Sequence, residues 1–193
     1  MQSNCVRVKS IYWFLAFLTV LIVTTSHAAE AQVSIYGTVA ATDYGYSYNR
    51  GSLNPRGDHV GFGGGSTYNF PIQSRFTAGV DLRGSITPAT TGGGFGAASL
   101  RFGFVPHHNP FKPYLQIGGG FVTAKIPVYF TNSPSSQTVT TPALDLAFGL
   151  DLRISPSFDL RLIELQGAGG SKGSTNTGLG SISTGIVYHF HRT

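Results

Sequence analysis

Residues 143–154 read ALDLAFGLDLRI, and apolar residues stand at every second position of this segment. Small or charged residues stand between them. Because successive side chains of a β-strand point to opposite faces of the sheet, this spacing predicts a strand with one wholly apolar face. Leucine, phenylalanine and isoleucine form that face at positions 144, 146, 148, 150, 152 and 154.

Other segments show the same period-two pattern, and helical periodicity is nearly absent after residue 31. In one of them the pattern slips at Ile163, Glu164 and Leu165. This slip predicts either a β-bulge or the point at which the strand leaves a membrane. Together with 143–154, these segments give eight strands, the others spanning 32–44, 59–70, 75–84, 96–104, 113–123, 158–166 and 180–190.

The connections between these segments alternate in length. Such alternation is typical of an up-and-down barrel in an outer membrane, with short turns on the periplasmic side and long loops outside. The short turns are 71–74, 107–111 and 155–157, and the longer connections, rich in Gly, Ser, Thr, Asn and Pro, are 45–58, 85–95, 125–142 and 167–177.

The chemical character of the two strand faces decides between a membrane barrel and a soluble one. A soluble lipocalin-like barrel would turn its apolar face inward and a charged face outward. Here the face opposite the apolar one is mostly Gly, Ala and Ser, which suits the narrow inside of an eight-stranded barrel. Only 11% of all residues are charged, against about 25% in soluble domains. We therefore predict an all-β fold, an eight-stranded antiparallel up-and-down transmembrane β-barrel.

A few charged residues fall on the face predicted to line the barrel. Opposite charges inside a narrow lumen are expected to pair, because isolated buried charges are costly. We interpret them as a packed polar core rather than a gated channel, since eight strands leave no open aqueous pore. The predicted interior polar network comprises Asp81, Arg83, Arg101, Asp145, Asp151, Arg153 and Arg161, with Glu164 as a further candidate.

Aromatic residues gather near the short turns and near the C-terminus. Aromatic side chains favour the interface between membrane and water, where they form girdles around barrels. We predict a periplasmic girdle that consists of Tyr68, Phe70, Phe76, Phe102, Phe104, Phe111, Tyr114, Phe158, Tyr188 and Phe190.

The first 31 residues have the layout of a secretory signal peptide. Arg7 and Lys9 precede the apolar run 11–23, and small residues follow it up to Ala31. The run is shorter than the roughly 20 residues of a membrane-spanning helix, which disfavours an anchor. We predict a signal peptide at 1–31 and a barrel domain at 32–193. Removing the signal also removes Cys5, the only cysteine, so thiolate chemistry is excluded.

Motifs for other functions are weak or missing. With residues 1–31 removed, 13 basic and 8 acidic residues become 11 and 7, and the unclustered charge of +4 gives nucleic-acid binding little support. The pair His107–His108 falls in a predicted turn, and the glycine runs lack the Lys-Ser/Thr of a phosphate loop. A lipid-modifying barrel enzyme would need a Ser–His–acid set near the outer side, where His59 beside Asp58 is the only histidine. We predict no catalytic site, cofactor or metal.

Three stretches resemble the small outer-membrane barrels of the OmpA-like and OmpX-like group. They are FKPYLQIGGGF at 111–121, GLDLRISPSFDLRLIEL at 149–165 and STGIVYHF at 183–190. The last is similar to the C-terminal strand that the family's assembly machinery recognises, although three residues follow Phe190 where the family usually ends on the aromatic.

The resemblance implies a non-catalytic protein of the outer membrane with a structural or surface-interaction role. Its expected partners are outer-membrane lipid, the barrel assembly machinery through the C-terminal strand, and an unknown extracellular partner through the long loops, above all 125–142. The alternatives are a narrow channel or porin-like protein, a lipid-modifying barrel enzyme and a soluble lipocalin-like carrier.

Overall fold

The computed structural model describes residues 32–48, 54–55, 59–73, 75–89, 92–106, 109–128 and 135–190. The predicted signal peptide, the pair His107–His108 and the residues after Phe190 lie outside these ranges. Within them the strands are β1 (Gln32–Tyr48), β2 (Asn54–Pro55), β3 (His59–Gln73), β4 (Phe76–Ile86), β5 (Gly93–Phe104), β6 (Phe111–Val128), β7 (Ser135–Arg153), β8 (Phe158–Lys172) and β9 (Thr175–Phe190).

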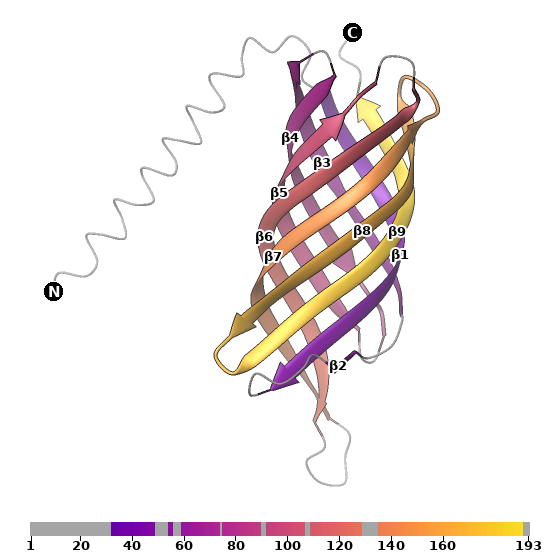
Figure 1. The fold of residues 1–193 in the computed structure, drawn as a ribbon. Helices are drawn as coiled ribbons and strands as arrows, with labels where there is room; N and C mark the ends of the chain where they lie inside the picture. Colours follow the sequence, from indigo (N-terminus) through magenta and orange to yellow (C-terminus); the bar gives the residue numbers. More distant parts are fainter. Residues whose placement is uncertain are drawn as a thin grey trace, which may run out of the picture. The chain divides into compact units, whose positions relative to one another are not determined.

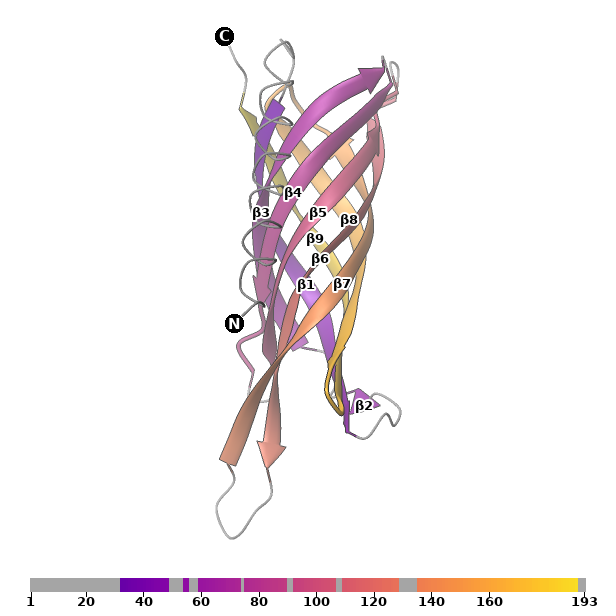
Figure 2. The ribbon, with the colours of Figure 1, turned by 90° about the vertical axis from the view of Figure 1, so that its left-hand side faces the viewer.

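The eight long strands form one closed antiparallel barrel. Each long strand pairs with the next along the chain, and β1 also pairs with β9, from Val33 opposite Phe190 to Tyr48 opposite Thr175. The strands are tilted against the long axis of the barrel (Figures 1 and 2). This architecture confirms the predicted fold class. No helix in the described ranges is long and apolar enough to cross a membrane.

The two ends of the barrel differ in their connections. We call the end that holds the connections 74–75, 105–110 and 154–157 the turn end, and the opposite end the loop end. The β6–β7 hairpin projects beyond the rest of the barrel at the loop end (Figure 2). Its ladder continues to Val128 opposite Ser135. The last pair between β7 and β8 is Leu144 opposite Gly169, two residues after Pro142, which has no N–H.

All four predicted long loops overlap strands, and the two that were predicted last in the sequence are the most shortened. Residues 125–128 and 135–142 belong to strands β6 and β7, and residues 167–172 and 175–177 belong to β8 and β9. Between β8 and β9 only Gly173 and Ser174 remain, and Gly173 has a positive φ of 64°, which glycine adopts readily. The loops were overestimated because ladder hydrogen bonds use the backbone, so Gly-, Ser- and Thr-rich segments can pair without an apolar alternation.

The orientation of the side chains is that of a membrane barrel. The large apolar side chains of the strands point outward and are exposed, among them Leu100, Leu146, Phe148 and Ile186. The buried residues include many polar and charged ones, such as Asp81 and Arg161. A wall of this character suits lipid and not water, because an exposed apolar band and a polar interior reverse the arrangement of a soluble barrel.

The predicted β-bulge in the seventh of the long strands is confirmed. The register between β8 and β9 shifts between Arg161 and Glu164, and that between β7 and β8 shifts between Leu150 and Asp151. At the bulge Leu162 and Ile163 are both exposed on the outer wall. Arg161 and Glu164, three positions apart, therefore both point into the lumen.

Candidate functional site

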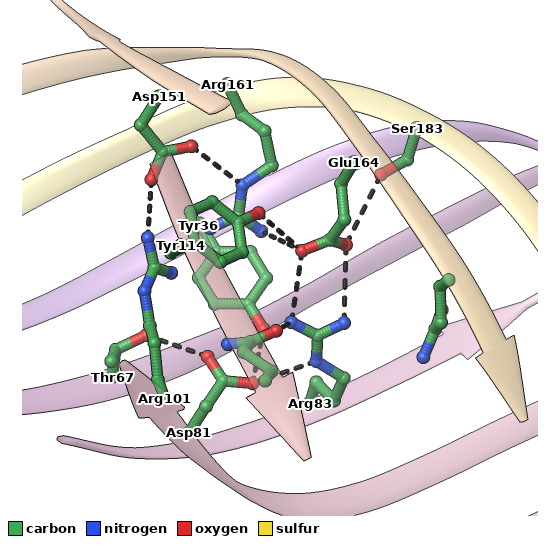
Figure 3. A network of polar contacts seen from close by, with 12 residues as sticks. Tyr36, Thr67, Asp81, Arg83, Arg101, Tyr114, Asp151, Arg161, Glu164 and Ser183 are labelled. Atoms are coloured by element: carbon green, nitrogen blue, oxygen red, sulfur yellow. Dashed lines mark hydrogen bonds and ion pairs between the residues drawn. The ribbon is translucent and has the colours of Figure 1, made fainter. Parts of the chain in front are cut away.

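The middle of the lumen is filled by six charged side chains. They are three arginines, Arg83, Arg101 and Arg161, and three acids, Asp81, Asp151 and Glu164, and none is more than 9% exposed. They come from β4, β5, β7 and β8 and meet across the barrel (Figure 3). Three positive and three negative charges make the cluster formally neutral, which is the arrangement that buried charges require.

Arg83 connects two of the three acids. Its Nε donates to Asp81 Oδ1 at 2.9 Å, and its Nη1 and Nη2 donate to the two carboxylate oxygens of Glu164 at 3.3 and 3.1 Å. The same Nη2 also donates to the side-chain oxygen of Gln116. This two-pronged contact with Glu164 is the geometry for which a guanidinium is suited.

Arg101 and Arg161 share the third acid. Arg101 Nη2 lies 2.6 Å from Asp151 Oδ2, and Arg161 Nε lies 3.1 Å from Asp151 Oδ1. Arg161 Nη1 also lies 3.2 Å from Glu164 Oε2, an ion pair that exists because the bulge turns both residues inward. The six charges therefore form one connected network.

Two tyrosines complete the network, and glycines make room for them. Tyr36 donates to Asp81 and Tyr114 donates to Glu164, at 3.0 and 2.6 Å. The Arg161 guanidinium lies 4.2 Å from the Tyr36 ring centre and 5.0 Å from that of Tyr114, which favours the cation. The strand residue opposite Tyr114 is Gly149, where a Cβ would lie 2.3 Å from the phenol ring.

Replacing Tyr114 by phenylalanine is expected to lower the free energy of unfolding by about 1.5–3 kcal/mol, because Glu164 loses a charge-assisted hydrogen bond in a buried site. Urea unfolding in lipid vesicles measures this change. The matched control is Tyr188→Phe, whose ring lies on the outer wall against Phe158 and Phe190, and which should change stability by less than about 0.5 kcal/mol. Equal effects of the two substitutions would contradict the placement of Tyr114 in the lumen.

Sequence-predicted interior residues separate into three groups in the structure. Five of them, Asp81, Arg83, Arg101, Asp151 and Arg161, meet in the network together with Glu164. Asp145 is buried nearer the loop end, where it accepts hydrogen bonds from Ser99 and Gln166 at 2.9 and 2.8 Å.

Arg153 is different, because its side chain is exposed. It has the inward phase of Asp145 and Asp151, but it is the last residue of β7, at the rim of the turn end. Alternation alone does not show where the lumen stops, so the prediction that places Arg153 inside is corrected.

The predicted aromatic girdle also needs one correction. Tyr114 is only 3% exposed and lies in the lumen, because it shares its face with the buried Gln116 and not with the exposed Leu115. It was assigned to the girdle from its closeness to a turn, without regard to its strand phase. The structure places the other nine aromatic residues on the outer face or partly exposed at the turn end, where Phe76 contacts Phe104 and Phe158 contacts Tyr188.

An apolar plug closes the lumen on the loop side of the network. We use this name for the buried cluster of Tyr44, Phe95, Val122, Ala143, Ala168 and Leu179. Val122 is fully buried and Tyr44 is 1% exposed. Between plug and network lies a cavity of about 20 Å³, bordered by Arg83, Glu164 and Phe95 among others, which is room for about one water.

A second polar chain lies at the turn end. Asp159 Oδ2 accepts from Lys112 Nζ at 2.6 Å and lies 2.7 Å from His189 Nε2, while His189 Nδ1 lies 2.8 Å from Ser34 Oγ. Ser34 and His189 are direct cross-strand partners in the seam between β1 and β9. The chain therefore ties β6, β8, β9 and β1 together, and it places His189 inside the lumen.

The order Ser34–His189–Asp159 superficially matches that of a serine hydrolase. Ser34 is 1% exposed, and the neighbouring cavity of about 70 Å³ is lined by His189 and Asp159 but not by Ser34. An acyl-transfer site needs a reachable nucleophile and free N–H donors for the oxyanion, whereas the β1 backbone around Ser34 pairs with strands on both sides. The geometry is that of a structural polar contact, in which the serine is buried against the histidine.

The predicted network left out five residues that the structure places in the lumen, which are Tyr36, Gln116, Asp159, Lys112 and His189. Strand phase was the available signal for Tyr36 and Gln116, which alternate with outward apolar neighbours such as Ile35 and Leu115. The same signal marked Asp159 and His189, which lie between outward aromatic or leucine residues, whereas Lys112 precedes the predicted strand 113–123. Among the described residues, no group of three or more His, Cys, Asp or Glu could hold a metal ion.

A closed eight-stranded barrel with an apolar outer wall and a polar, filled lumen belongs to the class of small transmembrane barrels of outer membranes. No model of a known protein family matches the sequence, and no curated protein matches it. Solved structures do match the fold.

Two crystal structures illustrate this likeness. The first is Ail, the attachment invasion locus protein of Yersinia pestis, at 14% sequence identity and a TM-score of 0.50, over 83% of this chain and 99% of that one. The second is the N-terminal β-barrel domain of Pseudomonas aeruginosa OprF, at 14% identity and a TM-score of 0.53, over 83% of this chain and 100% of that one. The chain thus has the fold of the small outer-membrane barrels, and the resemblance drawn from the sequence is confirmed at the level of fold.

Proposed function

We propose that this protein is a non-catalytic integral protein of the outer membrane, with a structural or surface-interaction role in the cell envelope. The observation that supports this function best is that the lumen is closed at two successive levels. The neutral ion network fills its middle, and the apolar plug fills the part nearer the loop end.

A narrow channel is the main alternative function. Both the ion network and the apolar plug argue against it, because each blocks the lumen. An ion would have to break contacts of Arg83 with Glu164, or of Asp151 with Arg101, all of which are buried and ion-paired. It would then have to cross the plug, where an apolar constriction excludes water and with it the hydration shell of the ion. The filled lumen therefore favours a rigid structural barrel over an ion channel.

The other two rivals have less support. A soluble lipocalin-like carrier would need an apolar lumen for its ligand, whereas the lumen of this barrel holds charges and the wall exposes leucine and phenylalanine. A lipid-modifying enzyme would need an accessible nucleophile, and Ser34 in the one Ser–His–Asp chain found among the described residues is buried.

The β6–β7 hairpin is the part of the surface best suited to a partner outside the cell. Its strands continue past the last pairs with β5 and β8, which are Ala124 opposite Gly93 and Leu144 opposite Gly169. Beyond these pairs Lys125 N donates to Gly92 O, and further out the two outer edges carry backbone groups that pair with no strand in the described part of the chain. Such edges can accept an extended segment of another protein by strand addition.

The apolar N-terminal segment and the last strand support a proposal for how the protein reaches the membrane. We propose that residues 1–31 act as a cleaved signal peptide and that 32–193 form the mature domain. The barrel assembly machinery would recognise strand β9, which ends in alternating outward residues Ile186, Tyr188 and Phe190. The same strand closes the barrel against β1.

Conductance in planar lipid bilayers tests the closed lumen. Protein extracted from the outer membrane and reconstituted is expected to show no discrete current steps, because the network and the plug both block ions. Heat-modifiable migration on SDS gels confirms in parallel that the sample is folded. Reproducible unitary currents from folded protein would overturn the proposal and establish the channel.

A further inference from the structure

The outer wall carries a groove near the loop end, on the strands that face the viewer in Figure 1. Its volume is about 780 Å³, within the range of about 300–1,000 Å³ that is usual for small-molecule sites. Ile117, Leu144 and Leu146 of β6 and β7 border it on one side. Its exposed floor is formed by Gly167 and Gly169 of β8 and Gly180 of β9, and Asp43 of β1, which pairs with Gly180, lies on the far side.

Strand register explains why the wall is hollow there. Leu146 pairs with Gly167, which in turn pairs with Gly180. In the next outward row, Leu144 pairs with Gly169, which pairs with Gly178. Two successive rows thus have a leucine on β7 and no side chain on β8 and β9. Beside these leucines the backbone itself is exposed at Gly167, Gly169 and Gly180.

The internal packing of the barrel does not require glycine at two positions of this floor. A Cβ built at Gly167 or Gly180 would meet no atom within 4 Å. At Gly120, by contrast, a Cβ would lie 1.9 Å from the carbonyl oxygen of Gly96. Glycine weakens a strand, and in a strand it often marks a place where a ligand approaches the backbone closely. Both glycines are exposed on the outer wall, so a molecule that approached them closely would come from outside the barrel.

Leu144 adds a second, independent observation. It is 77% exposed, more than the other outward apolar residues, because its partners on both sides, Gly119 and Gly169, have no side chain to cover it. It stands as an isolated ridge beside the groove. An occupant that lies along this ridge buries apolar surface on Leu144 as well as on the floor.

We infer that this groove binds one acyl chain of a membrane lipid. The groove is continuous with the lipid-facing wall, so hydrocarbon chains are what it meets. An unbranched chain can lie flat on a floor without Cβ atoms, with Leu144 and Leu146 along its side. A second copy of the barrel fits the groove less well. Its wall is convex, and the projecting Leu144 would keep that wall away from the floor of the groove.

The test fills the groove without disturbing the barrel. In the double variant Gly167→Leu/Gly180→Leu the new side chains point into open space, and Gly167→Ala/Gly180→Ala fills it partly. Gly37→Leu is the matched control, because Gly37 also points outward into open space but does not line the groove. The full-length gene product is extracted from membranes, checked by heat-modifiability, reconstituted with phosphatidylethanolamine and phosphatidylglycerol, and analysed by native mass spectrometry.

Wild type and Gly37→Leu are expected to retain one lipid molecule. The leucine double variant should retain it about tenfold more weakly, the factor lost with the burial of about two methylene groups, and the alanine variant should lie between. Equal lipid retention in all variants, or none in the wild type, would overturn the inference. A wild-type dimer that the leucine variant converts to monomers would overturn it in favour of a second copy as the occupant.

Discussion

Replacing Arg161 by alanine is expected to lower the free energy of unfolding by about 3–5 kcal/mol, the usual cost of removing one partner of a buried ion pair. Arg161 has no exposed surface and contacts both Asp151 and Glu164. Its removal leaves the network with three acids and two arginines. Urea unfolding of the protein in lipid vesicles, followed by tyrosine fluorescence, measures the change.

Arg153→Ala is the matched control for this prediction. Arg153 has the inward strand phase, yet its side chain is exposed at the end of β7. Its removal should change stability by less than about 0.5 kcal/mol. If both arginines proved equally costly, the barrel would extend further at the turn end than the structure shows. If neither Arg161→Ala nor Arg153→Ala changed the free energy of unfolding, the network would not stabilise the barrel.

Replacing Phe148 by arginine is the second large effect, with an expected loss of about 2–4 kcal/mol, because a charge would face hydrocarbon in the middle of the membrane. Phe148 lies near the middle of the barrel-forming part of β7, between Leu146 and Leu150, and its side chain is 53% exposed. In a water-exposed barrel the same substitution would change stability by less than about 0.5 kcal/mol. The measurement is again unfolding in vesicles.

The control for Phe148→Arg places the same charge at the loop end. Ser171 is exposed near the end of β8, and Ser171→Arg should leave stability within about 0.5 kcal/mol of the wild type. A small effect at both positions would show that the wall is not surrounded by lipid. A large effect at both would show that arginine disturbs the barrel for a reason other than burial in hydrocarbon.

The proposals assign different roles to the lumen and to the outer wall. The lumen residues stabilise the barrel, and the wall contacts other molecules. The inside holds a neutral network and an apolar plug, which suit a rigid barrel rather than a pathway. Under the proposed function, contacts with other molecules are made by the outer wall and by the projecting β6–β7 hairpin. The stability predictions address the inside, and the lipid-retention experiment addresses the wall.

The sequence by itself determined the class of fold, because the information is local. In 143–154 a strand and its two faces follow from the spacing of neighbouring residues, and the chemistry of those faces indicates lipid outside. The slip at Ile163 also predicted the bulge, since an extra residue in a strand changes the phase of those that follow it.

The tertiary structure alone decided which interior charges meet. Arg83 and Glu164 are 81 residues apart in sequence, and their contact depends on the tilt, register and closure of all the strands between them. It likewise decided that Arg153 lies beyond the lumen, and that Gly167 and Gly180 come side by side on the wall. Alternation shows whether a side chain points into or out of the barrel. It does not show how far along the barrel axis the residue lies or which residue it contacts.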